Sequence, residues 1–239
     1  LTGELNLDVP IGKRAGDVVN VGVQVDLVDA RLSMPLFNLE IDGLSGLVEY
    51  DTVTGLRSPG FTGMMFDEPV KGIIDTELIA EQGQINVQVD GTVSARDLHQ
   101  WSNQVLMTQL EGLLGYNVNV HIPVGGDAAP IWVEATSDLV GVHVDLPAPL
   151  GKPADDVAIV NYVHTFHSDG DKVDIRVEED VIAALKILDG ELIGGRVHFG
   201  NTPLGVVTFD RFDVSGSLDY VKYEDWERLF ESIQGESNV

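Results

Sequence analysis

The sequence of 239 residues contains no cysteine. Disulfide bonds, thiolate nucleophiles and cysteine-ligated zinc are therefore excluded. Basic residues are also scarce, because 14 Lys and Arg stand against 39 Asp and Glu, which gives a formal net charge of −25. A surface this acidic repels the phosphates of nucleic acids, so we expect no nucleic-acid partner.

Long hydrophobic runs are missing as well. The longest apolar candidate for a helix, Val181–Leu188, is interrupted by Lys186. It is far shorter than the roughly 20 residues that cross a bilayer as a helix. The sequence shows no basic segment followed by an apolar one, the pattern of a signal peptide. We therefore expect this chain to be a fragment of a larger protein, with any membrane anchor outside it.

The motifs of common enzymes are absent. There is no phosphate-binding loop, dinucleotide fingerprint, nucleophile elbow, HExxH motif or EF-hand loop. One cluster, HTFHSDGD, brings together His164, His167, Asp169 and Asp171. His164 and His167 would point to opposite faces of a strand, because their separation is an odd number of residues. We therefore predict no metal, no cofactor and no enzymatic activity.

Alternation of apolar and polar residues dominates the sequence. In the stretches 19–27, 85–90 and 173–178, Val, Ile or Leu stands at every second position. This period is typical of a strand with one apolar and one polar face. The stretch SDGD, at 168–171, predicts a hairpin, because Asp-Gly suits the positive φ of a type I′ turn. We predict a mainly β (α+β) chain whose long, twisted, mostly antiparallel sheet forms an apolar groove.

Two segments instead have the period of short amphipathic helices. The first lies at about residues 96–114, where apolar residues are mostly three or four apart, and the second at about 223–234. Each helix carries a tryptophan that follows a glycine at the same spacing. The two pairs are Gly91 with Trp101 and Gly216 with Trp226.

Two similar stretches of sequence indicate internal repetition. LNLDVPIG, at 5–12, and VNVHIPVG, at 118–125, share one pattern of apolar residues, Asn, Pro and Gly. Repetition at this scale is typical of arrays that grow by adding units. We predict two β-groove repeats, 1–117 and 118–239, each ending in a helix.

The most specific wording in the chain is ATSDLVGVHVDLPAPLGKPADD, at 135–156. It resembles a signature stretch of the YhdP family of large AsmA-like proteins of Gram-negative bacteria, in which SDL-x-G-x-x-x-x-LP-x-PLGK follows an I-x-V strand. The segments 91–101, 194–200 and 214–226 are similar to other parts of that family's unit, so the resemblance covers most of the chain. The matching signature residues are Ile131, Val133, Ser137, Asp138, Leu139, Gly141, Leu146, Pro147, Pro149, Leu150, Gly151 and Lys152.

The resemblance implies a function and a location that composition does not. Proteins of this type are anchored in the inner membrane by an N-terminal helix, extend through the periplasm and resemble repeating-β-groove lipid-transfer bridges. The resemblance thus implies non-enzymatic transport of phospholipid between the inner and outer membranes. This chain would be one periplasmic segment of the groove, tethered through a part that lies outside it, and its partners would be phospholipid acyl chains.

The alternating apolar positions are the candidate site. One residue of slip in register would reverse every assignment, because successive side chains point to opposite faces. The predicted lipid-groove positions are Val21, Val23, Val25, Ile85, Val87, Val120, Ile122, Val142, Val144, Val173, Ile175 and Val197.

Two other functions fit the same sequence. The first is a periplasmic scaffold for outer-membrane biogenesis, with a packed apolar core and envelope protein partners. The second is a β-rich hydrolase of envelope glycans, which would need clustered carboxylates in a cleft or a metal at His164 or His167.

Overall fold

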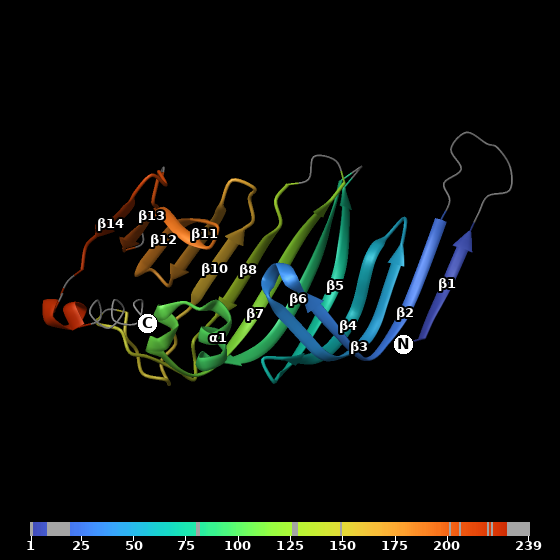
Figure 1. Cartoon of the computed structure of the whole chain (residues 1–239), viewed down its shortest axis with the longest axis horizontal. Coiled ribbons are helices and arrows are strands. Elements are labelled where there is room, and N and C mark those ends of the chain that lie inside the picture. Colours follow the sequence, from blue (N-terminus) through green and yellow to red (C-terminus); the bar gives the residue numbers. More distant parts are fainter. Residues whose placement is uncertain are drawn as a thin grey trace. The chain divides into compact units, whose positions relative to one another are not determined.

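The computed structural model describes most of the chain (Figure 1). Strands make up 62% of the structure. The fold is an open, largely antiparallel sheet with two short helices, which confirms the predicted fold class. The described residues are 2–8, 20–79, 82–125, 129–148, 150–200, 202–205, 207–218, 220 and 222–228.

Within these residues the chain forms fourteen strands, one α-helix with defined bounds and two short 3₁₀ helices; residues 223–228 are also helical. The elements are β1 (Thr2–Asp8), β2 (Asn20–Met34), η1 (Pro35–Phe37), β3 (Leu39–Asp51), β4 (Gly55–Met65), β5 (Glu68–Ile79), β6 (Gln82–Ser94), α1 (Ala95–Ser102), η2 (Val105–Gln109), β7 (Leu110–Val124), β8 (Trp132–Ser137), β9 (Val142–Val144), β10 (Val160–Thr165), β11 (Asp171–Val177), β12 (Val181–Leu188), β13 (Glu191–Phe199) and β14 (Phe212–Gly216).

The strands fall into two compact units that share β6 and β7. The first unit, 1–91 with 118–131, has the strand order β1-β2-β3-β4-β5-β6-β7. The second, 92–117 with 132–239, has the order β7-β8-β10-β11-β12-β13-β14, and β9 pairs with β7 beside this path. The ladders from β1 to β6 and from β8 to β13 are antiparallel, whereas β13 and β14 are parallel. The division into two compact units does not test whether the chain contains two copies of one repeat. The repeats at 1–117 and 118–239 therefore stay a prediction.

The bounds predicted for the first helix were wrong. Helix α1 begins where the hydroxyl of Ser94 accepts a hydrogen bond from the amide of Asp97 at 3.1 Å. It ends at Asn103, which adopts a left-handed conformation with φ of 51° and donates its amide to the carbonyl of His99. From Leu110 onward the chain is strand β7. Leu110, Leu113 and Leu114 have a helix-like spacing, but pairing with β9 makes this segment a strand. Asn103 was the missed stop signal.

Other predicted elements have mixed outcomes. The helix predicted at 223–234 is present over 223–228, and its remainder lies outside the described residues. The apolar stretch Val181–Leu188 is not a helix but strand β12, hydrogen-bonded to β11 and β13 on its two sides. The predicted hairpin is present, although the loop between β10 and β11 covers 166–170 and is longer than a two-residue type I′ turn.

Close packing between neighbouring strands yields a first prediction. An alanine at Gly72 would place its Cβ 2.3 Å from Cζ of Phe61 and 2.4 Å from the carbonyl oxygen of Gln88. We expect Gly72→Ala to lower the free energy of unfolding by about 1–3 kcal/mol, measured by urea denaturation. At Gly60 an added Cβ meets nothing within 4 Å, so Gly60→Ala is the control. Equal losses in the two variants would contradict the packing.

Candidate functional site: the apolar faces of the sheet

The register of the first unit places its apolar side chains on one face. Directly paired residues of an antiparallel ladder project to the same side. Val23 pairs with Tyr50, which pairs with Leu56, and Ile74 pairs with Val87. We call this side the first apolar face. It comprises Val21, Val23, Val25, Val48, Tyr50, Leu56, Ser58, Phe61, Gly72, Ile74, Thr76, Leu78, Ile85, Val87 and Val89.

The opposite side of the first unit is polar. Arg57 forms an ion pair with Asp75, with 3.4 Å between Nε and Oδ1. Between β6 and β7, Nδ1 of His121 lies 2.8 Å from Oδ1 of Asn86 and 3.1 Å from the side-chain nitrogen Nε2 of Gln84. Because His121 shares this polar side, its neighbours Val120 and Ile122 project to the first apolar face.

The first apolar face is only partly covered. The predicted positions of this unit, namely Val21, Val23, Val25, Ile85, Val87, Val120 and Ile122, are all partly exposed. Other residues of the same face, namely Ser58, Phe61 and Thr76, are buried. The face is therefore neither a sealed core nor an ordinary wetted surface.

Sequence reasoning missed part of this face because β4 contains a bulge. Between Ser58 and Phe61, β4 has one residue more than either neighbouring strand. Strict alternation from Ser58 would turn Phe61 to the polar side, whereas the bulge returns it to the apolar face. The Pro59-Gly60 pair inside a strand was the available signal, since proline and glycine in strands often mark bulges.

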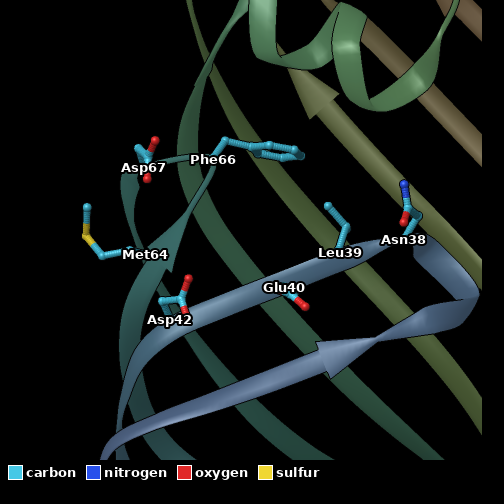
Figure 2. Close-up of a pocket in the computed structure, with 7 residues that line it drawn as sticks. All are labelled: Asn38, Leu39, Glu40, Asp42, Met64, Phe66 and Asp67. Atoms are coloured by element: carbon cyan, nitrogen blue, oxygen red, sulfur yellow. The ribbon is translucent and has the colours of Figure 1, made fainter.

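A small hollow lies beside the turn between β4 and β5, and Figure 2 shows its lining. It has a volume of about 400 Å³ and carries Glu40, Asp42 and Asp67 beside Met64 and Phe66. Arg31 partly neutralises it, because its Nε lies 2.6 Å from Oδ1 of Asp42. This mixed, acidic lining distinguishes the hollow from the apolar face.

The second unit has an apolar face of its own. Tyr162 pairs with both Ala135 and Ile175, and Ile175 pairs with Ala183, which pairs with Val197. We call this side the second apolar face. It comprises Val133, Ala135, Ser137, Val160, Tyr162, His164, Asp171, Val173, Ile175, Val177, Val181, Ala183, Leu185, Ile187, Gly195, Val197, Phe199, Phe212, Val214 and Gly216.

The connection from β13 to β14 covers the opposite side of this unit. Nη1 of Arg196 donates to the carbonyl of Leu204 at 3.3 Å, and the ammonium of Lys172 lies 5.7 Å from the ring centre of Phe209. Ile182 and Ala184, which project to this side, are buried. The connection therefore packs on the side of the sheet that carries the buried residues Ile182 and Ala184.

One end of the second apolar face is covered by the C-terminal helix. The ring of Trp226 meets that of Phe199 edge to face, with 6.3 Å between centroids. Phe199 pairs with Val181, which is buried. Of the predicted positions here, Val173 is buried, whereas Ile175 and Val197 are partly exposed.

At the other end, three polar side chains are linked by hydrogen bonds. The hydroxyl of Tyr162 lies 3.0 Å from Nδ1 of His164, and Nε2 of His164 lies 3.0 Å from Oδ2 of Asp171. Burial, and secondly the charge of Asp171, raises the pKa of Tyr162 to about 12. No group of three or more His, Asp or Glu that could hold a metal ion occurs in the part of the chain that the structure describes.

The signature stretch builds a small hydrogen-bonded lobe. Its strand β9 pairs with the start of β7, and the chain then turns back so that Val144 and Lys152 exchange backbone hydrogen bonds of 2.9 and 3.1 Å. Nζ of Lys152 donates to the carbonyls of Val142 at 2.7 Å and of Pro153 at 2.8 Å. A side chain at Gly151 would meet the carbonyl oxygen of Leu146 at 2.1 Å, so glycine is required there.

Two predicted groove positions lie in this lobe. Val142 and Val144 are 0% and 6% exposed, and they pair with Gly112 and Leu110 rather than with strands of the second apolar face. The groove assignment of the whole predicted set stays a prediction.

The comparison with known families agrees with the signature. A family model described as YhdP protein matches residues 1–239. The chain belongs to the YhdP family. YhdP is a family of envelope proteins and is not a known family of enzymes. No curated protein and no solved structure matches the chain. None of the described helices has the length and apolar character needed to cross a membrane.

The role of Lys152 in the YhdP signature can be tested directly. Lys152→Met removes two charge-assisted hydrogen bonds to backbone carbonyls, so we expect a loss of about 1–3 kcal/mol in local stability. Hydrogen exchange of the Val142 and Val144 amides should accelerate accordingly. Lys71→Met, at an exposed position of β5, serves as the control. Unchanged exchange in Lys152→Met would show that the lobe does not depend on this side chain.

The raised pKa of Tyr162 predicts a loss of stability at high pH. Because the folded chain holds the phenol proton more tightly than the unfolded chain, this contribution is fully present below pH 10. It is lost as the pH rises from 10 to about 12. Tyr162→Phe should therefore flatten the decline of the unfolding midpoint over that range, whereas Tyr220→Phe, at an exposed position, should not. Identical alkaline unfolding of the two variants would refute this.

Proposed function

We propose that this chain is a non-enzymatic segment of a phospholipid-transport groove between the inner and outer membranes. The observation that carries the proposal is the first apolar face. Its predicted positions on β2, β6 and β7 project to one side, remain partly exposed and are backed by a polar side. Membership of the YhdP family, which is consistent with an envelope protein of lipid-transport type, supports the same conclusion.

The physical requirement on such a face is modest. An acyl chain of about sixteen carbons gains roughly 12 kcal/mol when it leaves water, at ~0.8 kcal/mol per methylene. The face need not bind the chain more tightly than a bilayer does; it must only keep the methylenes out of water while the headgroup stays in solvent. Val, Ile and Leu side chains suit this task, because they make no directional contacts and allow the acyl chain to slide.

The proposal includes a location. The segment would lie in the periplasm and would be tethered to the inner membrane through a part of the protein outside this chain. The hydrogen-bonded lobe around Lys152 would be a structural element of the segment, because its apolar residues Val142 and Val144 are enclosed.

Site-specific photocrosslinking in living cells tests the groove. A photoreactive residue at Val87 or Val120 should form adducts with phospholipid, because both side chains project to the first apolar face. The same residue at Gln88 or Asn119, one position along each strand, projects to the polar side and should give few lipid adducts. Equal lipid labelling on both sides would overturn the assignment of the face.

Charge substitution provides a test with purified protein. Val87→Asp combined with Val120→Asp should abolish co-purifying phospholipid in native mass spectrometry, because a carboxylate in the groove would have to be desolvated beside the acyl chain. Gln88→Asp with Asn119→Asp adds the same charge to the opposite side and should leave lipid bound. A chain that carries no lipid, takes none from vesicles and crosslinks to a protein at Val87 would instead indicate an assembly scaffold.

A further inference from the structure

The second apolar face carries one polar cluster that a simple lipid trough does not need. Tyr162 and His164 lie on β10, and Asp171 is the first residue of β11. All three project to the face formed by residues such as Val173 and Ile175. They lie where the strands meet the 166–170 loop, at the opposite end from Phe199. The cluster therefore marks a polar margin of the apolar face.

The geometry fixes the direction of each hydrogen bond when the imidazole is neutral. The carboxylate of Asp171 can only accept, so Nε2 of His164 carries the hydrogen. Nδ1 then accepts, so the hydroxyl of Tyr162 donates to it. The ring of Phe166 stacks on His164 with 4.2 Å between centroids and holds its orientation. The amide of His167 donates to Oδ1 of Asp171 at 3.2 Å.

The hydrogen bonds within the cluster occupy its two donors and leave several acceptor lone pairs free for a ligand. The hydroxyl hydrogen of Tyr162 and the N–H of His164 are both spent within the cluster. The phenol oxygen of Tyr162 and both oxygens of Asp171 retain lone pairs. The His164 and Asp171 side chains are 20% and 31% exposed, so a ligand can reach them. The lysine on the neighbouring strand β12, Lys186, is engaged by Asp169 at 2.9 Å.

We propose that Tyr162 and Asp171, with His164 between them, form a headgroup site for the primary ammonium of an ethanolamine phospholipid. An ammonium offers three N–H donors and a positive charge, which match the free lone pairs and the carboxylate. A phosphate or a glycerol phosphate headgroup would bring negative charge to Asp171. This inference rests on the proposed function, because the acyl chain would lie on the second apolar face while the phosphate faces solvent.

Two lipids that differ only in N-methylation test the site. The chain is loaded from vesicles that contain equal amounts of phosphatidylethanolamine and phosphatidylcholine with identical acyl chains, and bound lipid is counted by native mass spectrometry. Methylation keeps the positive charge but removes every N–H donor. We expect about three- to tenfold enrichment of phosphatidylethanolamine, the range for one or two net hydrogen bonds. Equal binding of the two lipids would overturn the inference.

Variants then assign any preference to the cluster. Asp171→Asn and Tyr162→Phe should each reduce the enrichment while the total lipid bound stays the same. Asp174→Asn, an exposed carboxylate on the other side of β11, should leave the enrichment unchanged. Circular dichroism checks that every variant is folded.

The outcomes separate this inference from the proposal beneath it. Lipid binding without headgroup preference in the unaltered chain would overturn the ammonium site and leave the groove standing. A preference that survives both Asp171→Asn and Tyr162→Phe would place the selectivity elsewhere and overturn the site. A chain that takes up neither lipid would overturn the groove and the site together.

Discussion

The register between antiparallel strands is the constraint on which the rest of this structure depends. Each ladder keeps directly opposed side chains on the same side, so alternation within single strands adds up to two chemically different surfaces. In the first unit the separation of apolar and polar sides is maintained even where β4 has an extra residue at Pro59-Gly60. The bulge there places Phe61 opposite Gly72, on the apolar side. A slip of one residue between β5 and β6 would place Val87 opposite Ile73 or Asp75 instead of Ile74, among residues of the polar side.

The second unit has the same constraint on register, but its apolar residues lie on both sides of the sheet. Its strand β12 is apolar on both sides, with Ile182 facing away from the second apolar face. The connection between β13 and β14 contacts that side, where Arg196 donates a hydrogen bond to the carbonyl of Leu204. Two guanidinium groups, those of Arg196 and then Arg211, hold the pKa of Asp213 below its usual range. Both sides of β12 thus carry buried apolar residues, whereas Ile175 and Val197 of the second apolar face stay partly exposed.

Partial exposure of an apolar face has a cost in water, since each methylene left wetted forgoes about 0.8 kcal/mol of burial. The acyl chain of the proposed function would cover such a face without polar contacts. The YhdP signature contributes in a different way. Its lysine and glycine build the lobe around β9, so the most recognisable stretch of sequence supports the fold rather than the apolar faces.

The sequence by itself determined the strand class, the family and which residues of a single strand share a side, because period-two patterning and the signature stretch are local properties of the chain. It also marked the second helix at Trp226. Only the tertiary structure decided where α1 stops, because Asn103 and the ladder of β7 outweigh the helix-like spacing of the leucines at 110–114. The tertiary structure also decided that Val142 is buried and that the bulge in β4 places Phe61 opposite Gly72. It likewise brought Tyr162, His164 and Asp171 within hydrogen-bonding distance. Pairing partners distant in sequence set these features, and no local pattern encodes them.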